Sequence, residues 1–398
     1  MELVNIVTIK NKIPLYKDNI QSTSIEMIEL EEVGFEVVAN KTLYQVGDKA
    51  VFIQPDCCVP DTSLFESFIR PNGNESKSML GRVKGLPRRV RAKKFNLSKE
   101  PSGDFVYSQG ILLPYHEVQD YLYQLKDIEH KYIYLEGINL TKKLNITKYE
   151  ESNLITNNNL NFKQIENKFP EGLYKTSEEN INNVWHKITF PIVLIGTEKI
   201  DGSSITIGVT PEIPEGFICS RNIRKEITIK KIVGRKNKKW YKKLLFWIDF
   251  DLNIYKKFEN TDDNFIKYGL PYLNILLKDG SGNRVLRGEL NGWKILGSNN
   301  KNNPANKQLT NIKFFNIDKI NKYNEAEKIS YSDFKLETEY LKLPKIEEIF
   351  IKEFNSKEEL ISTCNNYFKD NMVEGIVVKT TDNKFSAKIM NLKYDSMK

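Results

Sequence analysis

Hydrophobic residues in the first third of the chain come in short runs that are separated by turn residues. Residues 50–53 form an apolar run after a turn at 46–48, and residues 111–113 form another that ends at a proline. Runs of this length predict short β-strands rather than helices. Several such strands favour a small closed barrel, for which an OB-fold-like β-barrel is the leading candidate.

The second half of the chain has a different pattern. Residues 192–195 form an apolar run, and residues 205–209 alternate between apolar and polar, as on a strand with one buried face. Asp201-Gly202 lies between them and is a common hairpin signal. The sequence therefore predicts a hairpin with Lys199 at the mouth of a sheet, and with Lys199 and Asp201 on one face.

A polar segment, residues 131–185, separates these two regions and contains three consecutive asparagines, which is typical of a linker. The expected fold is α+β, with a nucleic-acid-binding barrel over 1–130, a connector over 131–185 and a second domain over 186–398.

The chain of 398 residues carries a formal net charge of +8, which favours a polyanionic partner but would also suit many other proteins. Seven of the lysines and arginines lie close together between residues 82 and 94. A strand surface this basic suits a phosphate backbone, although a solvated loop would have the same composition. The candidate nucleic-acid contacts are Arg82, Lys84, Arg88, Arg89 and Arg91.

Other features bear on location and on metal binding. No apolar stretch reaches the roughly 18 residues needed to cross a bilayer, and residues 1–12 lack a signal-peptide core. The four cysteines do not form pairs with C-x-x-C spacing, so neither a zinc site nor a disulfide framework is indicated. We therefore expect an intracellular, cytoplasmic protein without a membrane segment. Residues 230–247, basic with interleaved aromatics, fit either a nucleic-acid stacking platform or a peripheral amphipathic helix.

Lys199-Ile200-Asp201-Gly202 has the spacing K-x-D-G, which is used in covalent nucleotidyl transfer. In that reaction a lysine amine attacks the α-phosphorus of a nucleoside triphosphate and keeps the nucleoside monophosphate. The motif alone is weak, because about one in ten long, lysine-rich chains would contain it by chance.

The residues that follow in order supply the other groups that such a reaction needs. Arg221 at a strand end suits a phosphate, and Glu289 lies on a strand between glycines that allow close approach of a ligand. Phe315 offers a face for a purine, Glu374 a carboxylate for a metal, and Lys388 a cation within a strand. Each residue by itself has an ordinary structural explanation, and only their combination is specific.

The order and the local contexts resemble the covalent nucleotidyltransferase superfamily of polynucleotide ligases and mRNA capping enzymes. Ser204 stands where DNA ligases and capping enzymes usually have an arginine, and the barrel-like region precedes the K-x-D-G motif instead of following it. This architecture is similar to the ATP-dependent RNA ligases of the Deinococcus and Naegleria type. Segments 46–48, 53–56, 108–114 and 175–179 extend the resemblance over nearly the whole chain.

The resemblance implies an ATP-dependent RNA ligase that seals 3′-hydroxyl and 5′-phosphate ends, such as a nick in a duplex, and acts as a monomer. Lys199 would carry AMP, Lys388 would steady the α-phosphate and Asp201 would help to orient the 3′-hydroxyl. The remaining roles are contact with the nucleotide for Glu198, Glu289 and Phe315, with the hydrated Mg²⁺ or Mn²⁺ for Glu374, and with the RNA end for Arg221 and Asn222.

One position departs from the RNA ligase pattern, because Met390 stands where a second lysine often follows Lys388. Lys393 lies nearby, but strand parity would point its side chain to the opposite face. The alternatives are a DNA nick ligase, a capping guanylyltransferase and an RNA-binding relative without activity.

Overall fold

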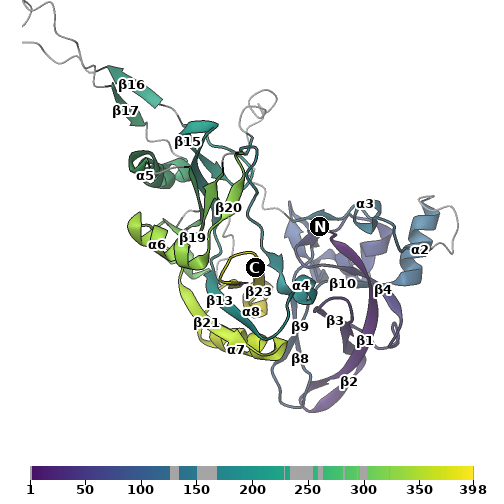
Figure 1. Cartoon of the computed structure of the whole chain (residues 1–398). Helices are drawn as coiled ribbons and strands as arrows, with labels where there is room; N and C mark the ends of the chain where they lie inside the picture. The colour runs from purple at the N-terminus through teal and green to yellow at the C-terminus, as the bar shows by residue number, and fades with distance from the viewer. Residues whose placement is uncertain are drawn as a thin grey trace, which may run out of the picture.

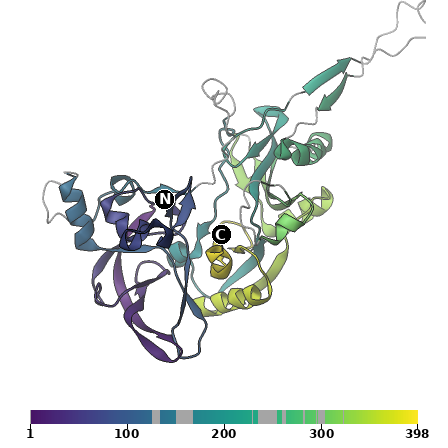
Figure 2. The ribbon, with the colours of Figure 1, turned by 180° about the vertical axis from the view of Figure 1, so that it is seen from behind.

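The computed structural model describes residues 2–125, 134–149, 168–227, 229–233, 254–258, 263–280, 283–293, 295, 303–321 and 323–397. Figure 1 and Figure 2 show the N-terminal part of the chain, up to residue 149, on one side of the molecule and the C-terminal part, from residue 168, on the other. No helix among these residues is long and apolar enough to span a membrane.

The N-terminal part contains a seven-stranded antiparallel sheet, and the strands predicted at 50–53 and 111–113 are both present. The pairings among the described strands do not close this sheet, so the closed barrel and its OB fold stay predictions. Its strands are β10 (Ile111–Pro114), β4 (Lys49–Ile53), β1 (Val4–Lys17), β2 (Ile20–Leu30) and β3 (Glu36–Asn40), with β8 (Lys93–Ser98) on β1 and β9 (Phe105–Ser108) on β8.

A smaller sheet carries the first part of the basic stretch, up to Arg89. Its strands are β11 (Thr147–Lys148), β5 (Cys57–Cys58), β7 (Leu86–Arg89) and β6 (Gly81–Val83). Three helices pack their apolar side chains into the same core: α1 (Glu66–Ile69), α2 (Tyr115–Gln124) and α3 (Leu140–Lys143). The core includes Val118 and Leu122, which are four residues apart and therefore lie on one face of α2.

The C-terminal part contains two five-stranded sheets. We call them the nucleophile sheet and the ribose sheet, after Lys199, the expected nucleophile, on the first and Glu289, expected to contact the ribose of the nucleotide, on the second. The nucleophile sheet has the order β12 (Glu179–Asn180), β23 (Ser386–Met390), β22 (Gly375–Lys379), β13 (Ile192–Lys199) and β21 (Glu348–Phe354). Only the short pair β12–β23 in it is parallel, among the described residues. Helices α4 (Ile181–Val184) and α7 (Lys357–Asp370) share its core, and α8 (Leu392–Ser396) follows β23.

The ribose sheet is antiparallel throughout its described pairings. Asp263 caps helix α5 (Asn264–Asp279), which packs on this sheet, by accepting hydrogen bonds from two backbone amides. Gly280 follows the helix in the left-handed conformation. The strands are β15 (Ile213–Ser220), β14 (Ser203–Thr210), β18 (Arg284–Asn291), β19 (Asn311–Ile320) and β20 (Ala326–Lys328), and the helices of its core are α5 (Asn264–Asp279) and α6 (Tyr331–Tyr340).

The predicted hairpin around Asp201-Gly202 is wrong. β13 lies in the nucleophile sheet and β14 in the ribose sheet, so the residues between them cross from one sheet to the other. A Cβ atom on Gly202 would lie 2.5 Å from the carbonyl oxygen of Leu290, so only glycine lets the chain pass this closely over β18. The crossing places Lys199, the last residue of β13, at the junction of the two sheets.

The final part of the predicted connector packs against the C-terminal sheets. Lys168 pairs with Ile223, Tyr174 bonds to Asp318, and β12 joins β23. The three asparagines of the connector lie outside the described residues. In the segment 230–247, the structure describes a strand, β16 (Ile229–Val233), paired with β17 (Ile254–Phe258), and residues 234–247 lie outside it. Neither alternative for that segment is tested.

Candidate active site

A cavity of about 570 Å³ lies where the two C-terminal sheets meet the N-terminal part. The structure brings most of the predicted site residues to its wall. Ten of the predicted residues line it: Lys199, Asp201, Lys388, Glu198, Glu289, Phe315, Glu374, Arg221, Asn222 and Arg89.

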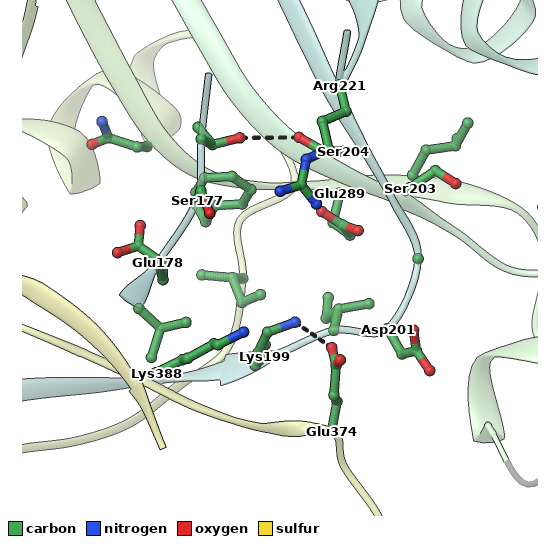
Figure 3. Close-up of a pocket in the computed structure, with 18 of the residues that line it drawn as sticks. Ser177, Glu178, Lys199, Asp201, Ser203, Ser204, Arg221, Glu289, Glu374 and Lys388 are labelled. Atoms are coloured by element: carbon green, nitrogen blue, oxygen red, sulfur yellow. Dashed lines mark hydrogen bonds and ion pairs between the residues drawn. The ribbon is translucent and has the colours of Figure 1, made fainter. Parts of the chain in front are cut away.

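Lys199 and Glu374 form an ion pair inside the cavity (Figure 3). Glu374 is only 8% exposed, and it immediately precedes β22. The first residue of β22, Gly375, is the register partner of Lys199. The backbone pairing of these two strands therefore sets the amine against the carboxylate.

Lys388 projects from β23 beside Lys199, and a residue of the N-terminal part faces it. Its Nζ lies 3.8 Å from Oδ2 of Asp56, and Oδ1 of the same carboxylate accepts a 2.8 Å hydrogen bond from Arg89. Burial lowers the pKa of Lys388, against the opposing effect of Asp56, and Lys199 lowers it further. The sequence reasoning did not select Asp56, although it lies in the segment 53–56 that carries part of the resemblance.

Glu289 lies on β18 opposite Ser204 of β14. Burial raises the pKa of Glu289 to about 8, with Lys199 opposing the rise and Glu374 adding to it. Figure 3 shows the Arg221 side chain extending toward Glu289, on the side of the cavity opposite Lys388. Two carboxyl groups and two cations thus surround the amine of Lys199.

Phe315 lies at an irregularity of β19, where the pairing with β18 shifts register between Arg287 and Gly288. Phe314 is fully buried in the core of the ribose sheet, whereas Phe315 lines the cavity. Glu198 lines the same cavity, and burial raises its pKa, with Lys313 opposing that rise. Lys379 donates a 3.1 Å hydrogen bond to the carbonyl oxygen of Phe315, and burial lowers the pKa of Lys379 to about 8.

Asp201 does not point toward Lys199, and the predicted common face is wrong because β13 ends at Lys199. Figure 3 shows its carboxylate turned away from the amine. Oδ2 of Asp201 accepts a 2.8 Å hydrogen bond from the hydroxyl of Tyr394, and its carbonyl oxygen accepts one of 2.9 Å from Asn303. Hydrogen bonds therefore hold both the side chain and the backbone carbonyl group of Asp201.

Arg221 and Asn222 follow the end of β15 and reach the cavity from the ribose sheet. The side-chain oxygen of Asn222 accepts a 3.0 Å bond from Lys175. Ser204, which stands where DNA ligases and capping enzymes usually have arginine, shares a 3.0 Å hydroxyl–hydroxyl bond with Thr176. The segment 174–178 thus forms a wall of the cavity, which the sequence showed only as part of the resemblance.

The five predicted nucleic-acid contacts of the N-terminal part have different environments. Arg82 and Lys84 are exposed, and Arg82 pairs with Glu75 at 3.0 Å. Arg88 donates to a backbone oxygen at 3.0 Å. Arg89 stacks on the ring of Tyr149 at 3.8 Å and lines the cavity, whereas burial lowers the pKa of Arg91.

Two of the sequence expectations for the end of the chain can be compared with the structure. Met390 is the last residue of β23 and is partly exposed. We expected Lys393 to point to the opposite face of the strand that carries Lys388. This expectation is wrong, because Lys393 lies on helix α8, and its side chain is exposed there.

The carboxylates of the cavity fit a hydrated divalent cation better than a fully coordinated one. The described residues contain no cluster of three or more side chains that could hold a metal ion by themselves. Mg²⁺ commonly keeps several waters and binds through one or two carboxylates together with substrate phosphates. Glu374, paired with a lysine that can exchange partners, is suited to that kind of site.

Searches for relatives gave matches at the level of structure. No protein-family model and no curated protein sequence matches the chain. The structure of Naegleria gruberi RNA ligase with pyrophosphate superposes with a TM-score of 0.67 and 20% sequence identity, covering 99% of this chain and 98% of that one.

Mutant forms of the same Naegleria gruberi ligase superpose equally well. One with AMP and manganese has a TM-score of 0.67 at 19% identity, and one with ATP and manganese has 0.65 at 20%. Both alignments cover 99% of this chain and 98% of the other. Along almost its whole length, the chain therefore has the α+β fold of the Naegleria gruberi RNA ligase, as the sequence motifs predicted.

Proposed function

We propose that this chain is an ATP-dependent RNA ligase that seals 3′-hydroxyl and 5′-phosphate ends. The observation that carries the proposal is the cavity around Lys199, where Glu374, Glu289, Lys388 and Phe315 converge. These groups come from two different sheets, and gathering several charged side chains around one cavity does not stabilise the fold. The neighbours of the same fold include a ligase with ATP and manganese, which supports ATP as the nucleotide.

In the first step, the amine of Lys199 gives up to solvent the proton that it carries in the ion pair with Glu374 and then attacks the α-phosphorus of ATP. A nitrogen–phosphorus bond forms, the bond to the β-phosphate oxygen breaks, and pyrophosphate leaves. Lys388 would stabilise the negative charge that develops on the α-phosphate, because its ammonium group lies next to Lys199 in the cavity. A divalent cation near Glu374 would supply further charge stabilisation when it is bound.

The nucleotide would lie across the cavity with its base on Phe315 and its ribose near Glu289. The raised pKa of Glu289 keeps this carboxyl largely protonated near neutral pH, so it can donate a hydrogen bond to a ribose hydroxyl as well as accept one. Glu198 lies near the base end of the cavity, where its polar atoms could distinguish one purine from another.

In the second step, the AMP passes from Lys199 to a 5′-phosphate, and in the third a 3′-hydroxyl displaces AMP and seals the strand. Arg221 and Asn222 would bind the terminal phosphate from the ribose-sheet side of the cavity. Asp201 would act in the third step, next to the 3′-hydroxyl. Arg82 and Lys84 are exposed and do not line the cavity, and they would contact the flanking duplex.

We further infer that a nicked duplex is the substrate and that one chain suffices, because a single chain supplies all of these groups. The N-terminal unit, residues 1–130, would bind RNA, residues 131–185 would connect, and residues 186–398 would carry the chemistry.

The test is labelling of the protein with ATP that carries a radioactive α-phosphate, followed by sealing of nicked duplexes. Wild type should acquire label and Lys199→Ala should not; label on the alanine variant would overturn the assignment. Sealing should require a ribose at the 3′-hydroxyl end. Equal sealing of deoxyribose ends would indicate a general nick ligase, and labelling by GTP instead of ATP would indicate a capping enzyme.

A further inference from the structure

The short helix α8 begins on the segment that holds Glu374. Asn391, its N-cap residue, donates its backbone N–H to the carbonyl oxygen of Glu374 at 3.0 Å. Its side-chain amide donates to the carbonyl oxygen of Val373, also at 3.0 Å, while its side-chain oxygen accepts from the backbone of Tyr394. Asn391 thus bonds to the two peptide groups that flank the Cα atom of Glu374, the proposed metal carboxylate.

The middle of α8 reaches the loop that follows the nucleophile. Tyr394 is 1% exposed, and its hydroxyl donates the 2.8 Å hydrogen bond that holds the carboxylate of Asp201. A buried hydroxyl that bonds to a carboxylate fixes the direction of that group more firmly than a solvent contact would. The conformation of Asp201 is therefore set by α8 rather than by the strand that carries Lys199.

The end of α8 reaches the N-terminal part. Oδ2 of Asp395 accepts a 3.2 Å hydrogen bond from the backbone N–H of Ala92. Its charge also acts on Arg89 and Arg91, the two arginines on either side of Val90 in the basic stretch. Figure 1 and Figure 2 both show α8 between the two parts of the molecule.

We propose that Tyr394 is a positioning residue for Asp201, and that Asp395 ties this position to the docking of the N-terminal part. The inference rests on the proposed ligase function and adds to it a route by which the N-terminal part influences the chemistry. When the N-terminal part is docked, α8 is seated, and Asp201 and the backbone of Glu374 take up the arrangement seen here. Arg89 and Arg91 then serve as docking residues as well as cations near the cavity.

The experiment measures lysyl-AMP formation and the sealing of a nick that already carries AMP, in the full-length chain. The variants are Tyr394→Phe, which removes only the hydroxyl, Asp201→Asn, their combination, and Asp395→Ala. Tyr340→Phe is the control, because it removes a Tyr–Asp hydrogen bond of the same 2.8 Å length outside the cavity.

Tyr394→Phe should slow the same step as Asp201→Asn by about tenfold, the size expected for one hydrogen bond to a charged group. The double variant should be no slower than Asp201→Asn, because in this proposal the hydroxyl acts on the reaction through that carboxylate. Asp395→Ala should slow that step as well, and Tyr340→Phe should not.

Two results would overturn the inference. One is a Tyr394→Phe protein that seals like wild type while Asp201→Asn is slow, and the other is a double variant in which the two effects multiply. A failure of the proposed function would be distinguishable, because wild type itself would then form no lysyl-AMP.

Discussion

Lys199 and Glu374 are held against each other by the pairing of two strands that meet at the cavity. Lys199 ends β13, and Gly375 begins β22 as its register partner, so the residue before Gly375 must lie beside the amine. A Cβ atom on Gly375 would come within 2.4 Å of the carbonyl oxygen of Ile389. The glycine after the glutamate therefore follows from the close approach of β23.

Replacing Glu374 by glutamine should slow lysyl-AMP formation by about a hundredfold, because it removes the charge that orients the amine and attracts the metal. The rate of labelling by ATP at increasing Mg²⁺ or Mn²⁺ measures this. Glu353→Gln, an exposed carboxylate on β21, is the matched control and should leave the rate unchanged. A Glu374→Gln rate equal to that of the control would contradict the assignment.

Phe315→Ala should raise the KM for ATP by about tenfold or more, since stacking of a base on an aromatic ring contributes about 1–3 kcal/mol. Phe314→Ala, one residue away on the buried face, should instead lower the free energy of unfolding by about 3–5 kcal/mol. Comparing ATP titrations and urea unfolding for both variants separates binding from packing. The prediction fails if Phe315→Ala binds ATP as wild type does.

Local pattern and motif order predicted much of the site, because those features depend on neighbours in the sequence. Phe315 and Glu289 are flanked by strand patterns, and the structure places both on the cavity wall. The order of motifs along the chain also predicted the fold. A prediction from strand spacing fails beyond the end of the strand. Asp201 shows this, because β13 ends at Lys199.

Contacts between distant segments could not be predicted from local pattern. Asp56 meets Lys388 only because the small N-terminal sheet docks beside β23, and no periodicity along the chain encodes that. For the same reason, the residues of the basic stretch lie in environments that its composition does not reveal. Density of charge alone does not distinguish the exposed Lys84 from Arg89, which is held by Asp56.

The raised pKa of Glu289 predicts a stability that falls as pH rises. The folded state keeps its proton up to about pH 8, whereas the unfolded chain loses it near its ordinary value. The folded state thus binds more protons between about pH 4.5 and 8, and its stability declines across that window by up to about 1.4 kcal/mol per pH unit.

Glu289→Gln should abolish this decline. The urea midpoint of the variant, measured relative to that of wild type, should therefore rise between pH 5.5 and pH 8, and the difference should change little above pH 8. Glu327→Gln, an exposed residue of β20, should follow wild type at every pH. Parallel curves for wild type and Glu289→Gln would mean that the carboxyl is already charged in the folded protein.

Arg287 and Asp318 form a fully buried ion pair beneath the ribose sheet, with a 2.7 Å bond between Nε and Oδ2. Asp318 also accepts a 2.7 Å bond from Tyr174, whose ring lies over the guanidinium of Arg287 and whose edge lines the cavity. Removing one partner leaves an uncompensated charge in the interior. Arg287→Met should therefore lower the free energy of unfolding by about 3–5 kcal/mol.

Arg287→Met combined with Asp318→Leu should recover most of this loss, because a buried pair is often replaceable by apolar residues at little cost. Urea unfolding with an unchanged m-value is the measurement, since it reports stability without a change in the surface exposed. If the double variant stays as unstable as the single one, Asp318 has a further role through Tyr174. In that case Tyr174→Phe should reproduce the remaining loss, and ATP binding should weaken with it.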